Sequence, residues 1–88
     1  MIIPKKLKIG GHIYKVILVD GEDINNDAGE QNRARNIIKI RKDIPQTQLE
    51  ETLLHEIIHA CNSGMKEEII DGLAVSLYQV LKDNYLLK

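Results

Sequence analysis

The sequence predicts an α+β fold in which a small antiparallel β-sheet of three or four strands precedes a two-helix hairpin. Two observations lead to this prediction. The first half of the chain contains short runs of alternating or β-branched residues between turn signals, and the second half contains two longer stretches with apolar residues at helical spacing. The length of 88 residues fits one domain over residues 1–88, with a thin hydrophobic core.

The predicted sheet begins with a β-hairpin. Residues 6–9 alternate between lysine and apolar residues, and residues 12–19 are rich in β-branched residues. Gly10 and Gly11 separate the two runs, and a Gly-Gly pair in this position is typical of a two-residue hairpin turn. We therefore expect two antiparallel strands at the start of the chain.

A polar segment follows this hairpin. Residues 20–34 are dominated by acidic residues, Asn and Gly, which is loop composition, and the acids lack the spacing of a calcium-binding loop. Within this segment, residues 29–32 form a candidate short strand. Residues 36–41 alternate again and predict a strand directly before the first helix. If that strand is an edge of the sheet, its free backbone groups can pair with an extended peptide.

Two helices fill the second half of the chain. The first is expected to begin at Pro45, which suits a first helical turn, or at the capping pattern Thr47-Gln-Leu-Glu50, and to end near Asn62. The second spans about residues 66–84. Its apolar residues recur at helical spacing and are expected to pack on the first helix as core: Ile69, Ile70, Leu73, Ala74, Leu77, Val80 and Leu81.

The first helix carries the pattern His-Glu-x-x-His at residues 55–59. On a helix His55 and His59 lie one turn apart on the same face, so their imidazoles can hold one zinc ion. Glu56 follows the first histidine and is placed to act as a general base toward a water that the metal activates. The alternative is a structural pair of histidines on a surface helix.

A catalytic zinc site usually has three protein ligands, and no histidine follows His59. The candidates for the third ligand are the carboxylates that open the second helix, Glu67, Glu68 and Asp71, and His12 of the hairpin. Glu67 and Asp71 share a helix face, so Glu67 can bind zinc while Asp71 orients an imidazole N–H. The alternative for these acids is an ordinary acidic first turn, which the helix dipole favours.

Residues 52–60 and 67–74 resemble small zincin-type metallopeptidase-like proteins of phages and prophages, which are similar to the minimal core of the ImmA/IrrE class. The hairpin around Gly10 and the ending at residues 77–84 share this resemblance, so it extends over most of the chain. The resemblance implies a zinc peptidase fold whose third ligand is Glu67. The chain departs from the family pattern because only seven residues separate His59 from Glu67.

Composition limits the classes of partner. The net charge is −1 and no basic stripe is present, so we expect no nucleic-acid partner. No apolar run reaches membrane-spanning length, and lysines follow the first residues too soon for a signal peptide, so we expect no membrane contact and a cytoplasmic location. The single cysteine, Cys61, excludes an intramolecular disulfide and is expected to be buried.

The sequence therefore predicts a zinc-dependent metallopeptidase that acts on a peptide or protein substrate, with the oligomeric state left open. One alternative is a non-catalytic zinc-binding interaction module on the same fold, because 88 residues leave little room for a specificity cleft. Another is a metal-free phage accessory or DNA-associated protein, although the lack of a basic stripe disfavours contact with nucleic acid. Tyr78 continues the helix face of Glu67 and Asp71; we expect it to pack in the core with an exposed hydroxyl, with oxyanion contact as the alternative.

Overall fold

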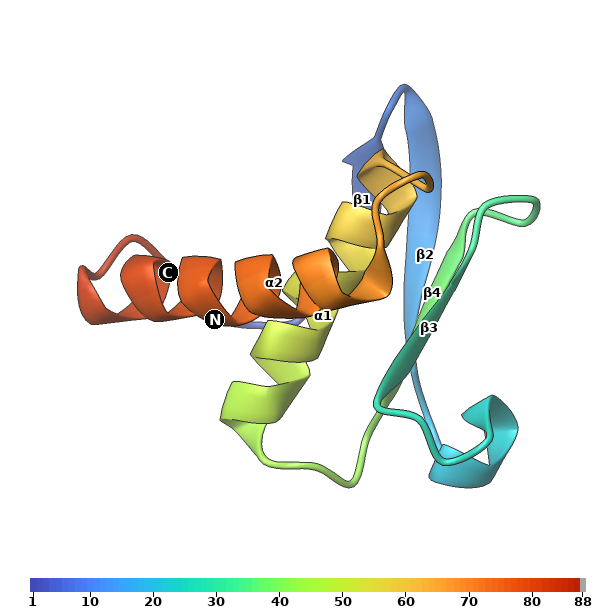
Figure 1. Cartoon of the computed structure of the whole chain (residues 1–88). Coiled ribbons are helices and arrows are strands. Elements are labelled where there is room, and N and C mark those ends of the chain that lie inside the picture. The colour runs from blue at the N-terminus through green and yellow to red at the C-terminus, as the bar shows by residue number, and fades with distance from the viewer. Residues whose placement is uncertain (88) are drawn as a thin grey trace.

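A computed structural model describes residues 1–87 and has strands followed by helices, which confirms the α+β class (Figure 1). The elements, in chain order, are β1 (Lys6–Ile9), β2 (His12–Val19), the short 3-10 helix η1 (Gly21–Ile24), β3 (Gly29–Asn32), β4 (Ile37–Arg41), α1 (Gln46–Cys61) and α2 (Glu67–Asp83). Pro45 is the N-cap residue of α1, and no side chain caps this end, so the Thr47–Glu50 capping pattern is not used.

The four strands form one sheet in the order β1-β2-β4-β3. β1 and β2 are the predicted antiparallel hairpin, with Ile9 opposite His12. The turn residues Gly10 and Gly11 have φ values of 59° and 84°, a conformation that residues with a Cβ rarely adopt. The Gly-Gly pair therefore fixes the hairpin where the sequence predicted it.

The prediction of a purely antiparallel sheet was wrong, because β2 and β4 are parallel, with Val16 opposite Ile38. Between these strands the chain reverses direction twice, once through η1 into β3 and once through the turn from β3 into β4. Two reversals return β4 to the direction of β2. β4 therefore lies in the interior of the sheet and has no free edge for a peptide; the free edges belong to β1 and β3.

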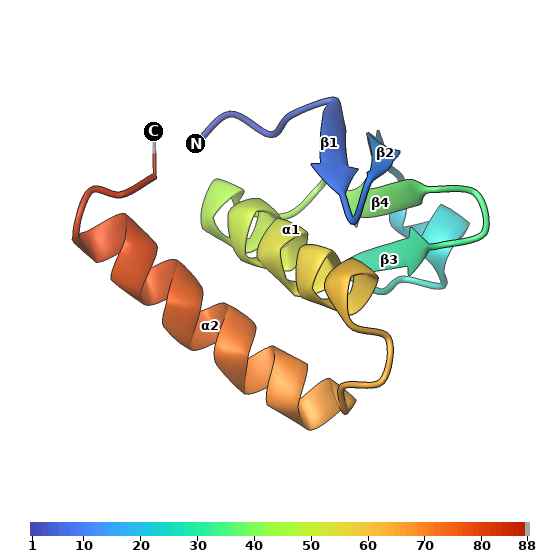
Figure 2. The same ribbon diagram turned by 90° about the horizontal axis from the view of Figure 1, so that it is seen from above.

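Helix α1 covers one face of the sheet, and α2 lies on the side of α1 that is turned away from the sheet (Figure 2). The alternation in β4 places Ile38 and Ile40 under α1, and both are fully buried. Leu53 of α1 packs into the same core. The other buried members of this cluster are Ile9, Tyr14, Val16, Leu49 and Ala60.

The expectation that the apolar stripe of α2 is core was only partly right. Ile70 and Ala74 are buried, together with Tyr78. Four further members of the stripe are exposed: Ile69, Leu73, Leu77 and Val80. Since α2 packs on a single helix, only one side of it is covered in the part of the chain that the structure describes.

Cys61 is the last residue of α1 and is exposed, so the prediction of a buried thiol was wrong. The core contact at this end of the helix is made by its neighbour Ala60 instead. Neither α1 nor α2 combines the length and the apolar character that a membrane crossing requires.

Candidate metal centre

Helix α1 places the two histidines of the motif side by side. The Nε2 atoms of His55 and His59 are 3.2 Å apart, and the ring centroids are 4.9 Å apart. Both side chains are half-buried on the face of α1 that is turned toward α2. The shared face that the four-residue spacing predicted is therefore present.

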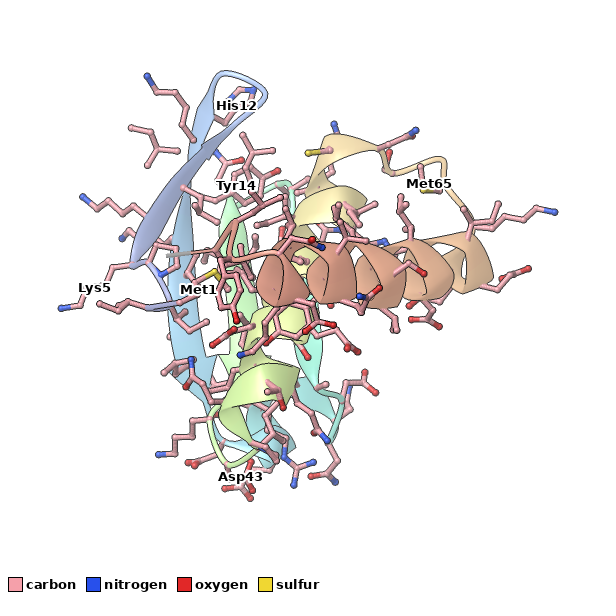
Figure 3. All side chains as sticks on the ribbon, turned by 90° about the vertical axis from the view of Figure 1, so that its left-hand side faces the viewer. Met1, Lys5, His12, Tyr14, Asp43 and Met65 are labelled. Carbon is pink, nitrogen blue, oxygen red and sulfur yellow. The ribbon has the colours of Figure 1, made fainter. Side chains whose placement is uncertain are left out.

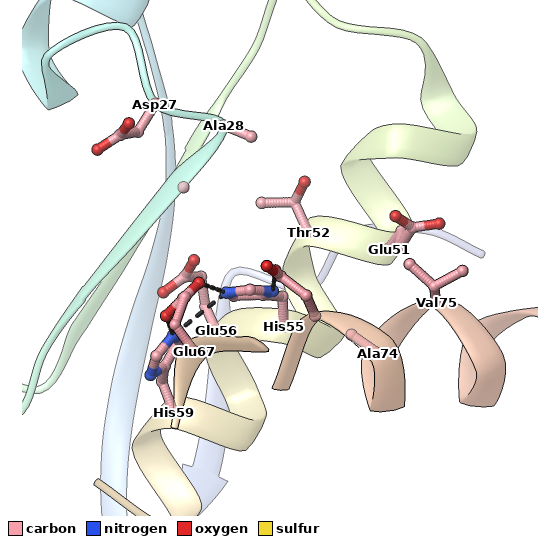
Figure 4. Close-up of a pocket in the computed structure, with 12 residues that line it drawn as sticks. Asp27, Ala28, Glu51, Thr52, His55, Glu56, His59, Glu67, Ala74 and Val75 are labelled. Carbon is pink, nitrogen blue, oxygen red and sulfur yellow. Dashed lines mark hydrogen bonds and ion pairs between the residues drawn. The ribbon is translucent and has the colours of Figure 1, made fainter. Parts of the chain in front are cut away.

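Glu67, the first residue of α2, closes the group. Its Oε1 lies 2.7 Å from Nε2 of His55, and its Oε2 lies 2.7 Å from Nε2 of His59 (Figure 4). One ligand atom from each of these three residues lies within 4.8 Å of the other two, so the group can hold a metal ion. Within residues 1–87 it is the one such group of His, Cys, Asp and Glu side chains.

The other candidates for a third ligand do not join this group. Glu68 is exposed on the next position of α2 and does not line the pocket around the histidines. His12 lies beside the turn of the β1–β2 hairpin (Figure 3) and lines a different pocket with Ala60 and Cys61. The structure therefore brings together Glu67, and neither Glu68 nor His12, with the histidine pair.

Asp71 contacts the other nitrogen of His55. Its Oδ1 lies 3.1 Å from Nδ1 of His55, one turn of α2 beyond Glu67. A proton on Nδ1 can then be donated to Asp71, which leaves the lone pair of Nε2 directed at Glu67 and His59. Asp71 therefore stands where a carboxylate would fix the tautomer of a metal-binding histidine.

These contacts bring four potential ligand atoms to one place. Nε2 of His55, Nε2 of His59 and two carboxylate oxygens converge on one point, and a neutral imidazole with a protonated Nδ1 has no proton on Nε2. Repulsion among such acceptors is relieved by a proton or by a cation. The donor set of two imidazole nitrogens and one carboxylate suits zinc.

Glu56 lies beside this group but is not part of it. The residue is only 6% exposed, and it makes no hydrogen bond within residues 1–87, but its side chain lines the pocket and its oxygens are not fully enclosed. Burial raises the pKa of Glu56 from 4.5 to about 7; His55 lowers it, and the negative charges of Glu67, Glu30 and Asp27 raise it further. Glu56 is therefore a buried carboxyl that titrates near neutral pH beside a candidate metal centre.

A glycine lets the sheet approach this carboxyl. A Cβ on Gly29 of β3 would lie 2.6 Å from Cγ2 of Thr52 and 3.1 Å from Oε2 of Glu56. No real Cβ fits at the first of these distances, so the close contact between β3 and α1 depends on the missing side chain. Sequence reasoning missed this role, because the partner of Gly29 lies more than twenty residues away.

A pocket of about 500 Å³ opens over the group, with walls from α1, α2 and the segment that enters β3 (Figure 4). Comparisons of the chain with protein-family models, with curated proteins and with solved structures found no match. The resemblance to zincin-type proteins therefore stays a prediction. What the site can do rests on its own geometry.

A second buried carboxylate on α1 was also missed. Glu50 accepts hydrogen bonds from the Tyr78 hydroxyl at 2.7 Å and from Gln46 Nε2 at 2.9 Å. Burial alone would raise the pKa of Glu50, but these hydrogen bonds and the positive charges of Lys82 and the N-terminus together lower it below its ordinary value. The hydroxyl of Tyr78 is thus buried against Glu50 instead of exposed, and Tyr78 does not line the pocket, which removes it as an oxyanion donor.

Proposed function

We propose that this protein is a zinc-dependent metallopeptidase that hydrolyses peptide bonds. His55, His59 and Glu67 hold the metal, and Glu56 is the general base. The observation that carries the proposal is the buried carboxyl of Glu56, which has no partner of its own and lies beside a three-residue donor group.

The donor set fits this assignment. Two imidazoles and one carboxylate are the protein ligands of one class of catalytic zinc site, and such sites leave a further position open. Zinc bound by these residues would polarise the scissile carbonyl and increase the acidity of water. Oδ1 of Asp71 lies 3.1 Å from Nδ1 of His55, so it can accept a proton from Nδ1 and orient the ring as this ligand role requires.

The raised pKa of Glu56 suits proton transfer in both directions. The carboxylate accepts a proton from the attacking water, and the carboxylic acid then gives it to the nitrogen of the leaving amine. A pKa of about 7 makes both forms accessible near neutral pH. Neutral water would be a poor nucleophile without such a base.

Strand β3 provides a place for an extended substrate. It is a free edge of the sheet, and its first residue, Gly29, lines the pocket. Free backbone N–H and C=O groups on an edge strand can pair with a peptide by β-addition. This edge takes the role that the sequence assigned conditionally to residues 36–41.

One observation favours a non-catalytic zinc-binding module instead. The exposed apolar side chains of Ile69, Leu73 and Val80 on α2 form the kind of surface that a protein partner covers. Glu56 argues against this alternative, because a purely structural metal site has no use for a neighbouring carboxyl whose pKa is raised to about 7.

The test combines metal content with cleavage. Protein purified without an affinity tag is expected to carry about one zinc per chain, and His59→Ala to lose it. Glu56→Gln is expected to keep zinc and to lose any peptidase activity by at least about a hundredfold, since only the base is removed. Elemental analysis measures the metal, and mass spectrometry of a digested peptide library measures new termini.

Glu68→Gln is the matched control, because it removes a carboxylate next to Glu67 that lies outside the group. It should behave as the wild type, whereas Glu67→Gln should weaken zinc binding. Termini that appear equally with wild type and with Glu56→Gln would reject the enzyme. Zinc far below one per chain after refolding with added metal would reject the metal centre itself.

A further inference from the structure

Helices α1 and α2 meet in a ladder of facing residues. His59 contacts Glu67, and one turn further along both helices His55 contacts Asp71. One further helical turn leads from His55 back to Glu51 along α1 and from Asp71 on to Val75 along α2. We call Glu51 and Val75 the third rung.

Both residues of this third rung line the pocket. Figure 4 shows Glu51 and Val75 on the same side of His55, at the end of the pocket away from His59. The third rung lies one helical turn, about 5.4 Å, beyond His55. An extended peptide advances about 3.3 Å per residue. A substrate side chain next to the bond that is cleaved at the metal centre can therefore reach the third rung.

The third rung differs from the first two because Glu51 and Val75 cannot form an ion pair or a hydrogen bond between their side chains. The carboxylate of Glu51 is half-buried and has no ion pair or hydrogen bond with any residue from 1 to 87. Val75 is apolar and 50% exposed although it borders the pocket, and the buried Ala74 lies beside it. This end of the pocket is thus an apolar wall with one unpaired carboxylate.

The rest of the pocket adds no positive charge. Its lining includes Asp27, Asp71 and Glu67, and no lysine or arginine of the described chain contributes to it. Bound zinc would offset part of this negative charge at the metal centre, one turn away from Glu51. A cationic group is therefore the favoured occupant of the third rung, and an anionic group is disfavoured.

We propose that Glu51, Ala74 and Val75 form a substrate subsite for a lysine or arginine side chain adjacent to the scissile bond. The aliphatic stem of such a side chain packs on Ala74 and Val75, and its charged end reaches the carboxylate of Glu51. This inference rests on the proposed peptidase function, because it assigns the substrate class of the same pocket.

The experiment uses the full chain loaded with zinc and a set of alanine-rich octapeptides with blocked termini. Each position of the peptide carries lysine, norleucine or glutamate in turn, so that the effect of side-chain length can be told apart from the effect of side-chain charge. Cleavage by the wild type is measured by mass spectrometry. Binding of the same peptides is measured with zinc-loaded Glu56→Gln, which retains the pocket and lacks the base.

At one peptide position, the peptide with lysine is expected to be cleaved and bound about fivefold better than the peptide with norleucine, which is the effect of one partly exposed ion pair. The peptide with glutamate should be the poorest. Glu51→Gln should abolish the difference between lysine and norleucine, and Glu51→Lys should invert the order of lysine and glutamate. Glu22→Gln, which removes an exposed carboxylate of η1, should leave the preference intact. All variants should retain zinc.

The outcomes separate this subsite from the peptidase function. Cleavage without a lysine preference, or a preference that survives Glu51→Gln, overturns the subsite and leaves the peptidase. Lysine-dependent binding to Glu56→Gln without any cleavage by the wild type overturns the peptidase and supports the subsite. Absence of both binding and cleavage overturns the two proposals together.

Discussion

Helix α1 buries two glutamates six residues apart, and the two have opposite surroundings. Glu50 is 2% exposed and accepts hydrogen bonds from Tyr78 and Gln46, with Nζ of Lys82 at 3.6 Å. Glu56 is 6% exposed and has no hydrogen-bond partner within residues 1–87. The pKa of Glu50 is lowered, whereas the pKa of Glu56 is raised to about 7.

Residue type and helix are the same for both glutamates, so the difference comes from their surroundings. Glu50 has hydrogen-bond donors and the positive charges of Lys82 and the N-terminus, whereas Glu56 is desolvated beside other carboxylates. A buried carboxylate with donors on both oxygens joins the elements that provide them, here α1 and α2. A buried carboxyl without donors costs stability, and proteins keep such groups where they take part in chemistry. The comparison thus separates a glutamate that links two helices from one whose carboxyl lies beside the candidate metal centre.

The largest expected effect concerns Glu56 in metal-free protein. The pKa of Glu56 is 4.5 in the unfolded chain and about 7 in the folded chain. The free energy of unfolding therefore falls as pH rises between these two values, and the full decrease is reached above about pH 7. Glu56→Gln cannot ionise, so it should be more stable than the wild type by about 3 kcal/mol at about pH 8.

Urea unfolding of both proteins in the presence of a chelator measures this difference. At about pH 4, where Glu56 is protonated in both states, the two proteins should have nearly equal stability. A difference that is the same at both pH values would contradict the assignment, since it would mean that Glu56 does not titrate between them.

The second effect concerns the donors of Glu50. Tyr78→Phe removes the hydroxyl that donates a hydrogen bond to Glu50 and leaves the buried carboxylate with one donor fewer. The free energy of unfolding should therefore fall by about 2 kcal/mol near pH 7. Because the folded-state pKa of Glu50 is lowered, its stabilising contribution is present above the unfolded pKa and is lost as pH falls through the folded pKa.

Thermal or urea unfolding across pH measures the loss in Tyr78→Phe, which should shrink in acid. Tyr85→Phe is the matched control, because Tyr85 is 91% exposed, and it should change nothing. Zinc content should stay at the wild-type level, since Tyr78 lies outside the donor group. A loss of zinc in Tyr78→Phe would show that the two glutamate environments are not independent.

The smallest effect concerns the glycine that covers Glu56. In Gly29→Ala the new methyl collides with Cγ2 of Thr52, and relief of this contact should cost about 1 kcal/mol of stability and displace Glu56. Thr52→Ser removes Cγ2 and retains the hydroxyl, so the double variant should recover most of the lost stability. Equal stability of Gly29→Ala with and without Thr52→Ser would show that the contact does not limit the approach of β3.

Local periodicity was sufficient to predict the helices and to place His55 and His59 on one face, because both follow from spacing within a few turns. The sequence also limited the candidates for the third ligand to three carboxylates and His12, of which the fold brings Glu67 to the histidines. It could not give the direction of β4, because alternation is the same in parallel and antiparallel strands.

The same limit explains the missed glutamate. The sequence around Glu50 resembles a capping pattern, and nothing local shows that Tyr78, 28 residues later, donates to it. Likewise, spacing could not show that Ile69 and Leu73 lie on an uncovered side of α2, because exposure depends on how many layers pack on the helix. Contacts between distant segments decide these features.

All three donors of the candidate metal centre lie within the short segment from residue 55 to residue 67. Bringing them together closes only a small loop, so little chain entropy is lost when an unfolded chain wraps around an ion. An unfolded chain that retains affinity for zinc diminishes the stabilisation that zinc gives to the native state. A metal bound at this candidate centre should therefore stabilise the fold less than an ion of equal affinity whose ligands come from remote segments. It could also bind before the sheet has formed.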